Sequence, residues 1–145
     1  MQTRLRSELH QALKKKDSLR ASTIRMMIAE LTNKEKEGKP LEEQDVYRVF
    51  YGMLRRREEA IAEFNKANRQ DLVEKEKAEM EIIKEFLPSP MGEEEIKEEV
   101  RQVIAELNAR DMKSMGKVMG ILTQKLAGRV AGGVLSKIVK EELSK

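Results

Sequence analysis

The segment Ser114–Val139, SMGKVMGILTQKLAGRVAGGVLSKIV, contains five of the eight glycines of the chain. Its apolar residues recur at intervals of three and four, which predicts one helix over about 114–126 and a second over about 133–143. The second helix is expected to carry Val134, Leu135, Ile138 and Val139 on its apolar face, with Lys137 and Lys140 opposite. The stretch AGRVAGG between these helices predicts a turn. Because glycine destabilises a helix by about 0.5–1 kcal/mol relative to alanine, glycines inside helices need an explanation.

Two of these glycines lie away from the apolar stripe. Gly116 and Gly120 fall on the polar flank of the first helix, beside Lys117. Bare backbone at that flank would allow a ligand or another chain to approach closely. The alternative is that the glycines serve only helix packing and a tight turn. Helical spacing alone leaves both interpretations open.

The composition predicts an all-α protein. Of the 145 residues, 38% are charged and only 3% are aromatic, and Lys, Glu, Leu, Ala and Met dominate. This mixture favours helices and lacks the β-branched and aromatic runs that strands need. The chain contains no cysteine, which excludes disulfides, thiol catalysis and thiolate metal sites.

The stretch LPSPMG, residues 87–92, is the clearest boundary in the chain. Two prolines within three residues remove amide donors and restrict the residues before them. We therefore expect an N-terminal helical domain of about four helices at residues 1–88 and a small C-terminal three-helix domain at 89–145. In the first domain, Asp17 is expected to cap the second helix, and Leu13 is expected on the apolar face of the first.

No motif in the chain predicts catalysis. Gly128 and Gly133 match the G-x-x-x-x-G frame of a phosphate-binding loop, but valine and leucine follow where lysine and serine or threonine are required. His10 is the only histidine and has no catalytic neighbours. The carboxylates are spaced as weak ion pairs on helix surfaces, and the arginines at 55–57 point in three directions around a helix, which indicates a structural role. We expect no catalytic residue, no metal and no cofactor.

The charge is distributed unevenly along the chain. Residues 1–27 carry a net charge of +5, residues 28–109 carry −7, and residues 110–145 carry +5. A basic end segment favours a polyanionic partner, although ordinary solvated helix faces would explain the charge as well. We predict a C-terminal surface at which cations meet phosphates and glycines allow close approach. Its residues are Lys113, Lys117, Lys125, Arg129, Lys137, Gly116, Gly120, Gly128, Gly132 and Gly133.

Structured RNA is the partner that this surface would fit best. The segment contains no aromatic residue, so stacking on single-stranded bases is not expected, whereas recognition of folded RNA by its shape needs no stacking. We expect tRNA or another structured RNA, together with a translation-related protein partner, and neither DNA nor a membrane. The N-terminal MQTRLRSELHQ lacks an apolar core of signal-peptide length, so a cytoplasmic location is expected.

The motifs resemble those of a known family. SMGKVMGILTQKLAGRVAGGVLSKIVKEEL is similar to the C-terminal signature of the YqeY-like family (GatB/YqeY domain) and to the tail of the B subunit of the tRNA-dependent glutamine amidotransferase. IRMMIAEL and RRREEAIAEFNKANRQDLVEKEKAEMEIIKEFLP extend the resemblance over nearly the whole chain. Two positions depart from the usual pattern: Asn68 stands in place of glycine and Ala131 in place of aspartate.

The resemblance implies an all-α fold and a tail module that contacts tRNA. The transamidation chemistry belongs to other domains of the larger subunit, so an amidotransferase or carbon–nitrogen ligase label would be inherited from that subunit. We expect a non-catalytic RNA-binding accessory module. One alternative is a protein-interaction adaptor that uses acidic helices or an apolar helix face. Another is an enzyme of aminoacyl-tRNA amide chemistry, for which the sequence offers no nucleophile.

Overall fold

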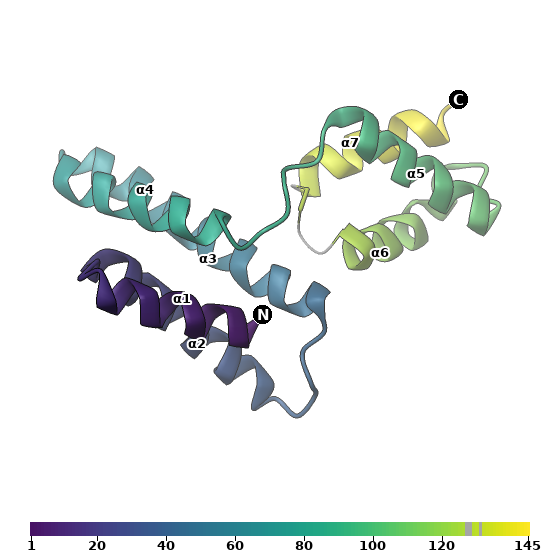
Figure 1. Cartoon of the computed structure of the whole chain (residues 1–145). Helices are drawn as coiled ribbons and strands as arrows, with labels where there is room; N and C mark the ends of the chain where they lie inside the picture. Colours follow the sequence, from purple (N-terminus) through teal and green to yellow (C-terminus); the bar gives the residue numbers. More distant parts are fainter. Residues whose placement is uncertain (127–128, 131) are drawn as a thin grey trace. The chain divides into compact units, whose positions relative to one another are not determined.

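The computed structural model of the chain describes residues 1–126, 129–130 and 132–145. These residues form seven α-helices and one short 3₁₀ helix with no strand among them, which confirms the predicted all-α class (Figure 1). The elements are α1 (Gln2–Lys14), α2 (Ser18–Glu35), α3 (Glu43–Lys66), α4 (Gln70–Lys84), α5 (Glu93–Leu107), η1 (Met112–Ser114), α6 (Met115–Leu126) and α7 (Gly132–Leu143).

The helices form two compact units, each with its own hydrophobic core. The N-terminal unit, Met1–Pro88, contains α1 to α4. The C-terminal unit, Ser89–Lys145, contains α5, η1, α6 and α7. None of the described helices combines the length and the apolar character that crossing a bilayer requires.

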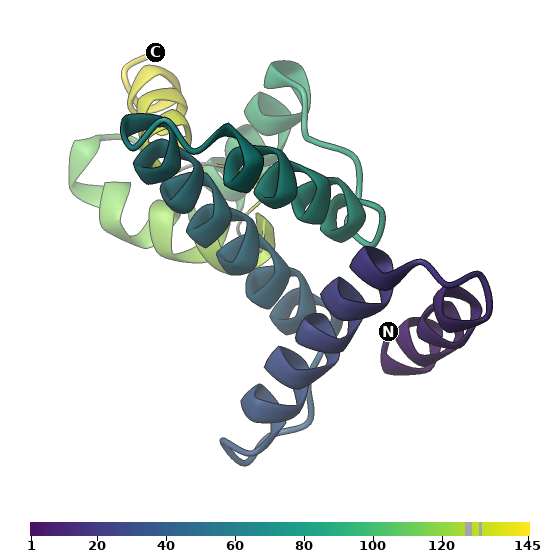
Figure 2. The same ribbon diagram turned by 90° about the vertical axis from the view of Figure 1, so that its left-hand side faces the viewer.

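The N-terminal unit is built from two helical hairpins. Helix α1 packs against α2, α3 packs against α4, and α2 also contacts α4. Figure 2 shows α3 as one long helix with α4 folded back beside it. The side chains at the centre of this unit are fully buried. They include Leu5, Ile24, Met27, Leu31, Phe50 and Ile83.

Local chemistry sets the turns of the N-terminal unit. A side-chain oxygen of Asp17 accepts a hydrogen bond from the backbone N–H of Arg20 at 3.1 Å, which confirms the predicted cap of α2. Lys16, just before it, has a left-handed backbone with a φ of 59°, and Asn68 turns the chain between α3 and α4 with a φ of 57°. Left-handed backbone is unfavourable for residues that carry a Cβ atom, and asparagine tolerates it better than lysine.

The predicted burial of Leu13 is wrong, because 47% of this side chain is exposed. Helix α1 buries Leu5 and Ala12. Each step along a helix rotates the side chain by about 100°, so Leu13 points away from the direction in which Ala12 is buried. Apolar character alone therefore did not decide which residues of α1 face the core.

The C-terminal unit is a bundle in which α5, α6 and α7 each pack against the other two (Figure 1). Acidic residues occupy the first turn of α5, where the helix dipole favours negative charge, and the helix ends at Asn108 with a left-handed φ of 53°. The side chains that hold the bundle together are apolar and buried. They are Ile96, Val100, Val103, Val118, Leu122, Leu126, Leu135, Ile138, Val139 and Leu143.

Candidate nucleic-acid interface

Four glycines of the predicted surface are open to solvent. Gly116 and Gly120 lie in α6, Gly132 and Gly133 begin α7, and all four are exposed. A Cβ atom added at any of them would meet no atom within 4 Å beyond the immediate helical surroundings, and none of the four has a positive φ. Within the described residues, neither packing nor backbone conformation therefore requires glycine at these positions. Gly128, also predicted for this surface, lies outside the described residues.

Three of the predicted cations are exposed next to these glycines in sequence. Lys113 lies in η1, Lys117 in α6 and Lys137 in α7, and none of the three forms an ion pair within the described part of the chain. Residues three or four apart share one face of a helix, so Lys117 lies on the same face of α6 as Gly120, and Lys137 lies on the same face of α7 as Gly133. The outer faces of α6 and α7 thus present free positive charge beside bare backbone.

Lys125 lies in a different environment. Its Nζ atom is 2.8 Å from Oε2 of Glu99 and donates a hydrogen bond to Oε1 of Gln102 at 3.4 Å. Both partners lie on α5, so Lys125 occupies the flank of α6 that faces α5. Lys125 and Glu99 therefore form an ion pair, with side chains that are 37% and 31% exposed. Lys125 therefore joins two helices of the bundle in addition to any contact with a ligand.

Arg129 is half-buried and lies between α6 and α7 in the sequence. Its Nη2 atom donates a hydrogen bond to the backbone carbonyl oxygen of Ser89 at 2.8 Å. Its Nε atom is buried and has no hydrogen-bond partner among the described residues. The structure therefore places this guanidinium against the chain that precedes α5.

Three further residues of these helices are exposed. Lys140 was expected opposite the apolar face of the last helix and is exposed, but it was not included in the predicted surface. Ile121 on α6 is 39% exposed, and Val134 on α7 is 50% exposed although we predicted it on the apolar face. That prediction is wrong because the buried stripe of α7 runs through Leu135, Ile138 and Val139. The rotation of about 100° per residue turns Val134 outward.

A charged contact joins α5 to α7. Burial raises the pKa of the Glu142 carboxyl, but hydrogen bonds from Arg101 and Lys145 outweigh it, so this pKa lies below its ordinary value. The Nε atom of Arg101 is 3.2 Å from Oε2 of Glu142, and the Nζ atom of Lys145 is 3.1 Å from Oε1. This contact ties the last helix of the bundle to the first.

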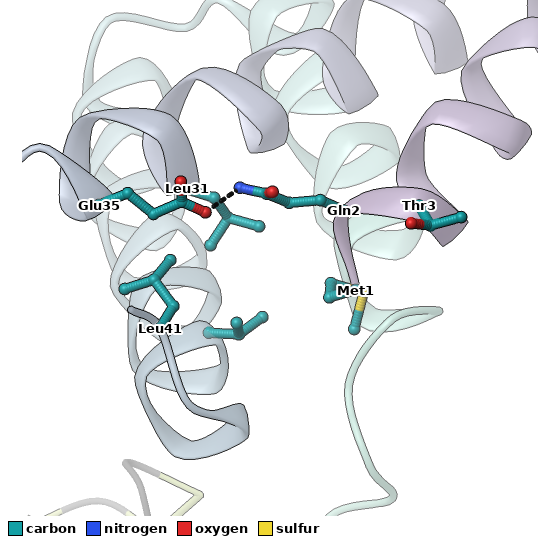
Figure 3. Close-up of a pocket in the computed structure, with 7 residues that line it drawn as sticks. Met1, Gln2, Thr3, Leu31, Glu35 and Leu41 are labelled. Atoms are coloured by element: carbon teal, nitrogen blue, oxygen red, sulfur yellow. Dashed lines mark hydrogen bonds between the residues drawn. The ribbon is translucent and has the colours of Figure 1, made fainter. Parts of the chain in front are cut away.

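A pocket in the N-terminal unit is a second candidate for a functional site (Figure 3). It has a volume of about 260 Å³, and the side-chain amide of Gln2 donates a hydrogen bond to the carboxylate of Glu35 across it. Leu31 and Leu41 supply part of its apolar wall. One carboxylate held by an amide is neither an acid–base pair nor an activated nucleophile. The described residues also contain no cluster of three or more metal-ligating side chains.

Comparisons with known proteins identify relatives of the chain. A family model described as Yqey-like protein matches residues 2–143. A protein of Pyrenophora tritici-repentis named Altered inheritance of mitochondria protein 41, mitochondrial, is 32% identical over 143 residues, which are 95% of this chain and 78% of that protein. Proteins of the same name from Lachancea thermotolerans and Saccharomyces cerevisiae are 39% and 32% identical over 71% and 73% of this chain.

The matched region spans 57% of the Lachancea protein and 60% of the Saccharomyces protein. The names of these relatives contradict the cytoplasmic location expected from the sequence, because they describe mitochondrial proteins. That expectation rested on a missing apolar leader, whereas mitochondrial targeting segments are amphipathic and rich in arginine. The match over residues 2–143 agrees with the motifs in both units, and the chain belongs to the YqeY-like family.

Proposed function

We propose that this chain is a non-catalytic accessory module that binds tRNA or another structured RNA through the outer faces of α6 and α7. One observation carries the proposal: Gly116, Gly120, Gly132 and Gly133 are exposed although nothing in the described structure requires glycine there. Such glycines cost helix stability, and contact with a partner would offset that cost.

The chemistry of the two faces fits a phosphate backbone. Lys117 and Lys137 are exposed and unpaired within the described residues, so a phosphate would not have to displace a carboxylate. The first N–H groups of a helix have no partner within it, and in α7 the first two residues, Gly132 and Gly133, carry no side chain. Contacts of this kind hold a nucleic-acid backbone without reading its sequence.

The same faces favour paired RNA over single strands. Residues 111–145 contain no aromatic side chain that could stack on an unpaired base. Recognition would then rest on the shape and phosphates of a folded RNA. The resemblance of residues 114–143 to the tail of the amidotransferase B subunit implies the same class of partner.

A titration of the full chain with bulk tRNA, followed by fluorescence anisotropy at two salt concentrations, tests the proposal. We expect saturable binding that weakens with salt and exceeds binding to double-stranded DNA. Lys117→Glu with Lys137→Glu should weaken binding to every structured RNA and lower the salt slope by about 0.9 for each phosphate that the variant no longer binds. Lys77→Glu, a single charge reversal at an exposed position on α4, is the control for each single reversal and should leave binding unchanged. No binding at low salt, or full affinity in the double variant, would contradict the proposal.

A second candidate, the protein-interaction adaptor, is favoured by the exposed apolar residues. Ile121 and Val134 are 39% and 50% exposed and lie on the two helices that carry the open glycines. Exposed aliphatic side chains near bare backbone also suit a partner helix. Ile121→Ser with Val134→Ser should abolish a protein contact that survives nuclease treatment, and should leave the salt slope of RNA binding unchanged.

A further inference from the structure

A pocket of about 520 Å³ lies in the N-terminal unit, where α2, α3 and α4 meet. This volume falls within the range of small-molecule sites. Its walls include the apolar side chains of Met26 and Met53, and charged groups from all three helices reach it. Every residue that lines the pocket belongs to the N-terminal unit, whereas the surface proposed to bind RNA belongs to the C-terminal unit.

A buried arginine lines the pocket. Arg57 is 9% exposed and Glu79 is 5% exposed, and the Nε atom of Arg57 donates to Oε2 of Glu79 at 3.0 Å. The Nη1 atom donates to the carbonyl oxygen of Met53 at 3.2 Å. The acceptor of Nη2 is the thioether sulfur of Met26 at 3.7 Å, which is a weak acceptor. One edge of a buried guanidinium is therefore without an oxygen partner in the described structure.

Two more charges at the pocket are incompletely paired. Oε2 of Glu76 is 3.9 Å from Nε of Arg57, beyond hydrogen-bonding distance. Lys75 is exposed and forms no ion pair with any described residue. Arg56, by contrast, is held by Glu30 at 3.2 Å. Among the described residues, the pocket thus presents an edge of Arg57 whose acceptor is only a thioether sulfur, an unpaired Lys75, and a Glu76 carboxylate held only by a loose ion pair with Arg57.

We propose that this pocket binds a small zwitterion of the free amino acid class. Arg57 and Lys75 receive the carboxylate, Glu76 receives the protonated amine, and the side chain of the ligand lies against Met26 and Met53. A simple anion would bring its charge next to Glu76 and Glu79, and a simple cation would bring its charge next to Lys75. A zwitterion offers a carboxylate to Arg57 and Lys75 and an ammonium group to Glu76, and it adds no net charge to a partly buried site.

The alternative is that Arg57 and Glu79 only hold the three helices in register. A buried ion pair is a costly way to do this, because desolvation offsets much of its attraction. A purely structural role for Arg57 and Glu79 would also leave unexplained why Lys75 and Glu76 lie at the pocket without complete pairing. Ligand binding that depends on Lys75 and Glu76 therefore separates the two interpretations.

The experiment is an NMR titration of the full chain with each standard amino acid in turn at millimolar concentration. Backbone amides at Ala29 and Ala60, which line the pocket, should shift with at least one of them. The methyl ester of that amino acid, which keeps only the amine charge, and its N-acetyl form, which keeps only the carboxylate, should each bind at least about tenfold more weakly. The proposal is overturned if no standard amino acid shifts these amides, or if either derivative binds as well as its parent.

Matched variants on α4 connect binding to the named charges. Lys75→Gln and Glu76→Gln should each weaken binding about tenfold, because each removes one charge-assisted hydrogen bond. Lys77→Gln and Glu74→Gln change exposed neighbours that do not line the pocket, and should leave affinity unchanged. Arg57 and Glu79 are left intact, and thermal unfolding of all four variants checks that each is folded. Equal affinity in Glu76→Gln and Glu74→Gln would contradict the assigned contact.

Discussion

The Nη2 atom of Arg129 donates a hydrogen bond to the carbonyl oxygen of Ser89 across 2.8 Å. Arg129 lies between α6 and α7, and Ser89 is the first residue of the C-terminal unit. The contact therefore anchors the chain that leads into α5 to the connection between the other two helices of the bundle. Arg129 was predicted as a phosphate ligand, and this hydrogen bond gives it a positioning role inside the unit.

Arg129→Gln should lower the free energy of unfolding of the C-terminal unit by about 1 kcal/mol, because the hydrogen bond to Ser89 is broken. Urea denaturation measures this change, and faster hydrogen exchange at Met91 and Gly92 should accompany it. Lys117→Gln is the control: we expect it to leave the free energy of unfolding unchanged and to weaken RNA binding. Weaker RNA binding in Arg129→Gln at unchanged stability would show instead that Arg129 meets phosphates directly.

Gly116→Ala and Gly120→Ala should stabilise α6 while weakening RNA binding. Alanine favours a helix over glycine by about 0.5–1 kcal/mol, and the added methyl groups meet nothing within 4 Å in the described structure. The same methyl groups would stand between α6 and an approaching phosphate backbone. Thermal unfolding and tRNA anisotropy on the same samples measure the two effects.

Gly52→Ala is the matched control for this pair. Gly52 lies inside α3, where an added Cβ atom also meets nothing within 4 Å. This change should raise stability by a similar amount and leave tRNA affinity unchanged. If Gly116→Ala and Gly120→Ala behave like Gly52→Ala in both measurements, the α6 glycines have no part in RNA binding.

Lys16→Gly should stabilise the N-terminal unit by about 1 kcal/mol. Lys16 has a left-handed backbone with a φ of 59°, which costs a residue with a Cβ atom about 1–2 kcal/mol and glycine much less. Lys15, its neighbour, has a φ of −81° in the right-handed region. Lys15→Gly also removes one positive charge but relieves no backbone strain, so it should not stabilise the N-terminal unit. A chemical denaturation series on both variants checks the difference.

The stability of the C-terminal unit should fall in acid partly through Glu142. The Arg101 and Lys145 contacts keep the pKa of Glu142 below its ordinary value against the opposing effect of burial, so the folded state favours the ionised carboxylate. This contribution is present above the unfolded pKa, near 4.5, and is lost as the pH falls through the lower folded pKa. The melting temperature of Glu142→Gln should lie below that of the natural chain at neutral pH, and the two should converge in acid. A constant difference down to the lowest pH measured would contradict this linkage.

The helix boundaries were largely readable from the residues, because caps, glycines, prolines and apolar spacing act over a few positions. The predicted helix at 133–143 differs by one residue from α7, Gly132–Leu143. Asp17 caps α2 as predicted, because an N-cap acts on an amide three residues away. That Lys117 and Lys137 form no ion pair with any described residue could not be read this way, since any of the many carboxylates could have paired with them.

Helical periodicity defines which residues share a face, but the neighbouring helices determine which face is buried. Leu13 and Val134 are apolar and exposed for this reason, and the glycines of α6 are open because no helix of the C-terminal unit covers them. The hydrogen bonds of Arg129 with Ser89 and of Arg57 with Glu79 join residues far apart in the chain. Arg129 and Ser89 are separated by 40 positions, and Arg57 and Glu79 by 22. Such pairs form only when the packing of apolar faces brings distant helices together, so composition and spacing cannot reveal them.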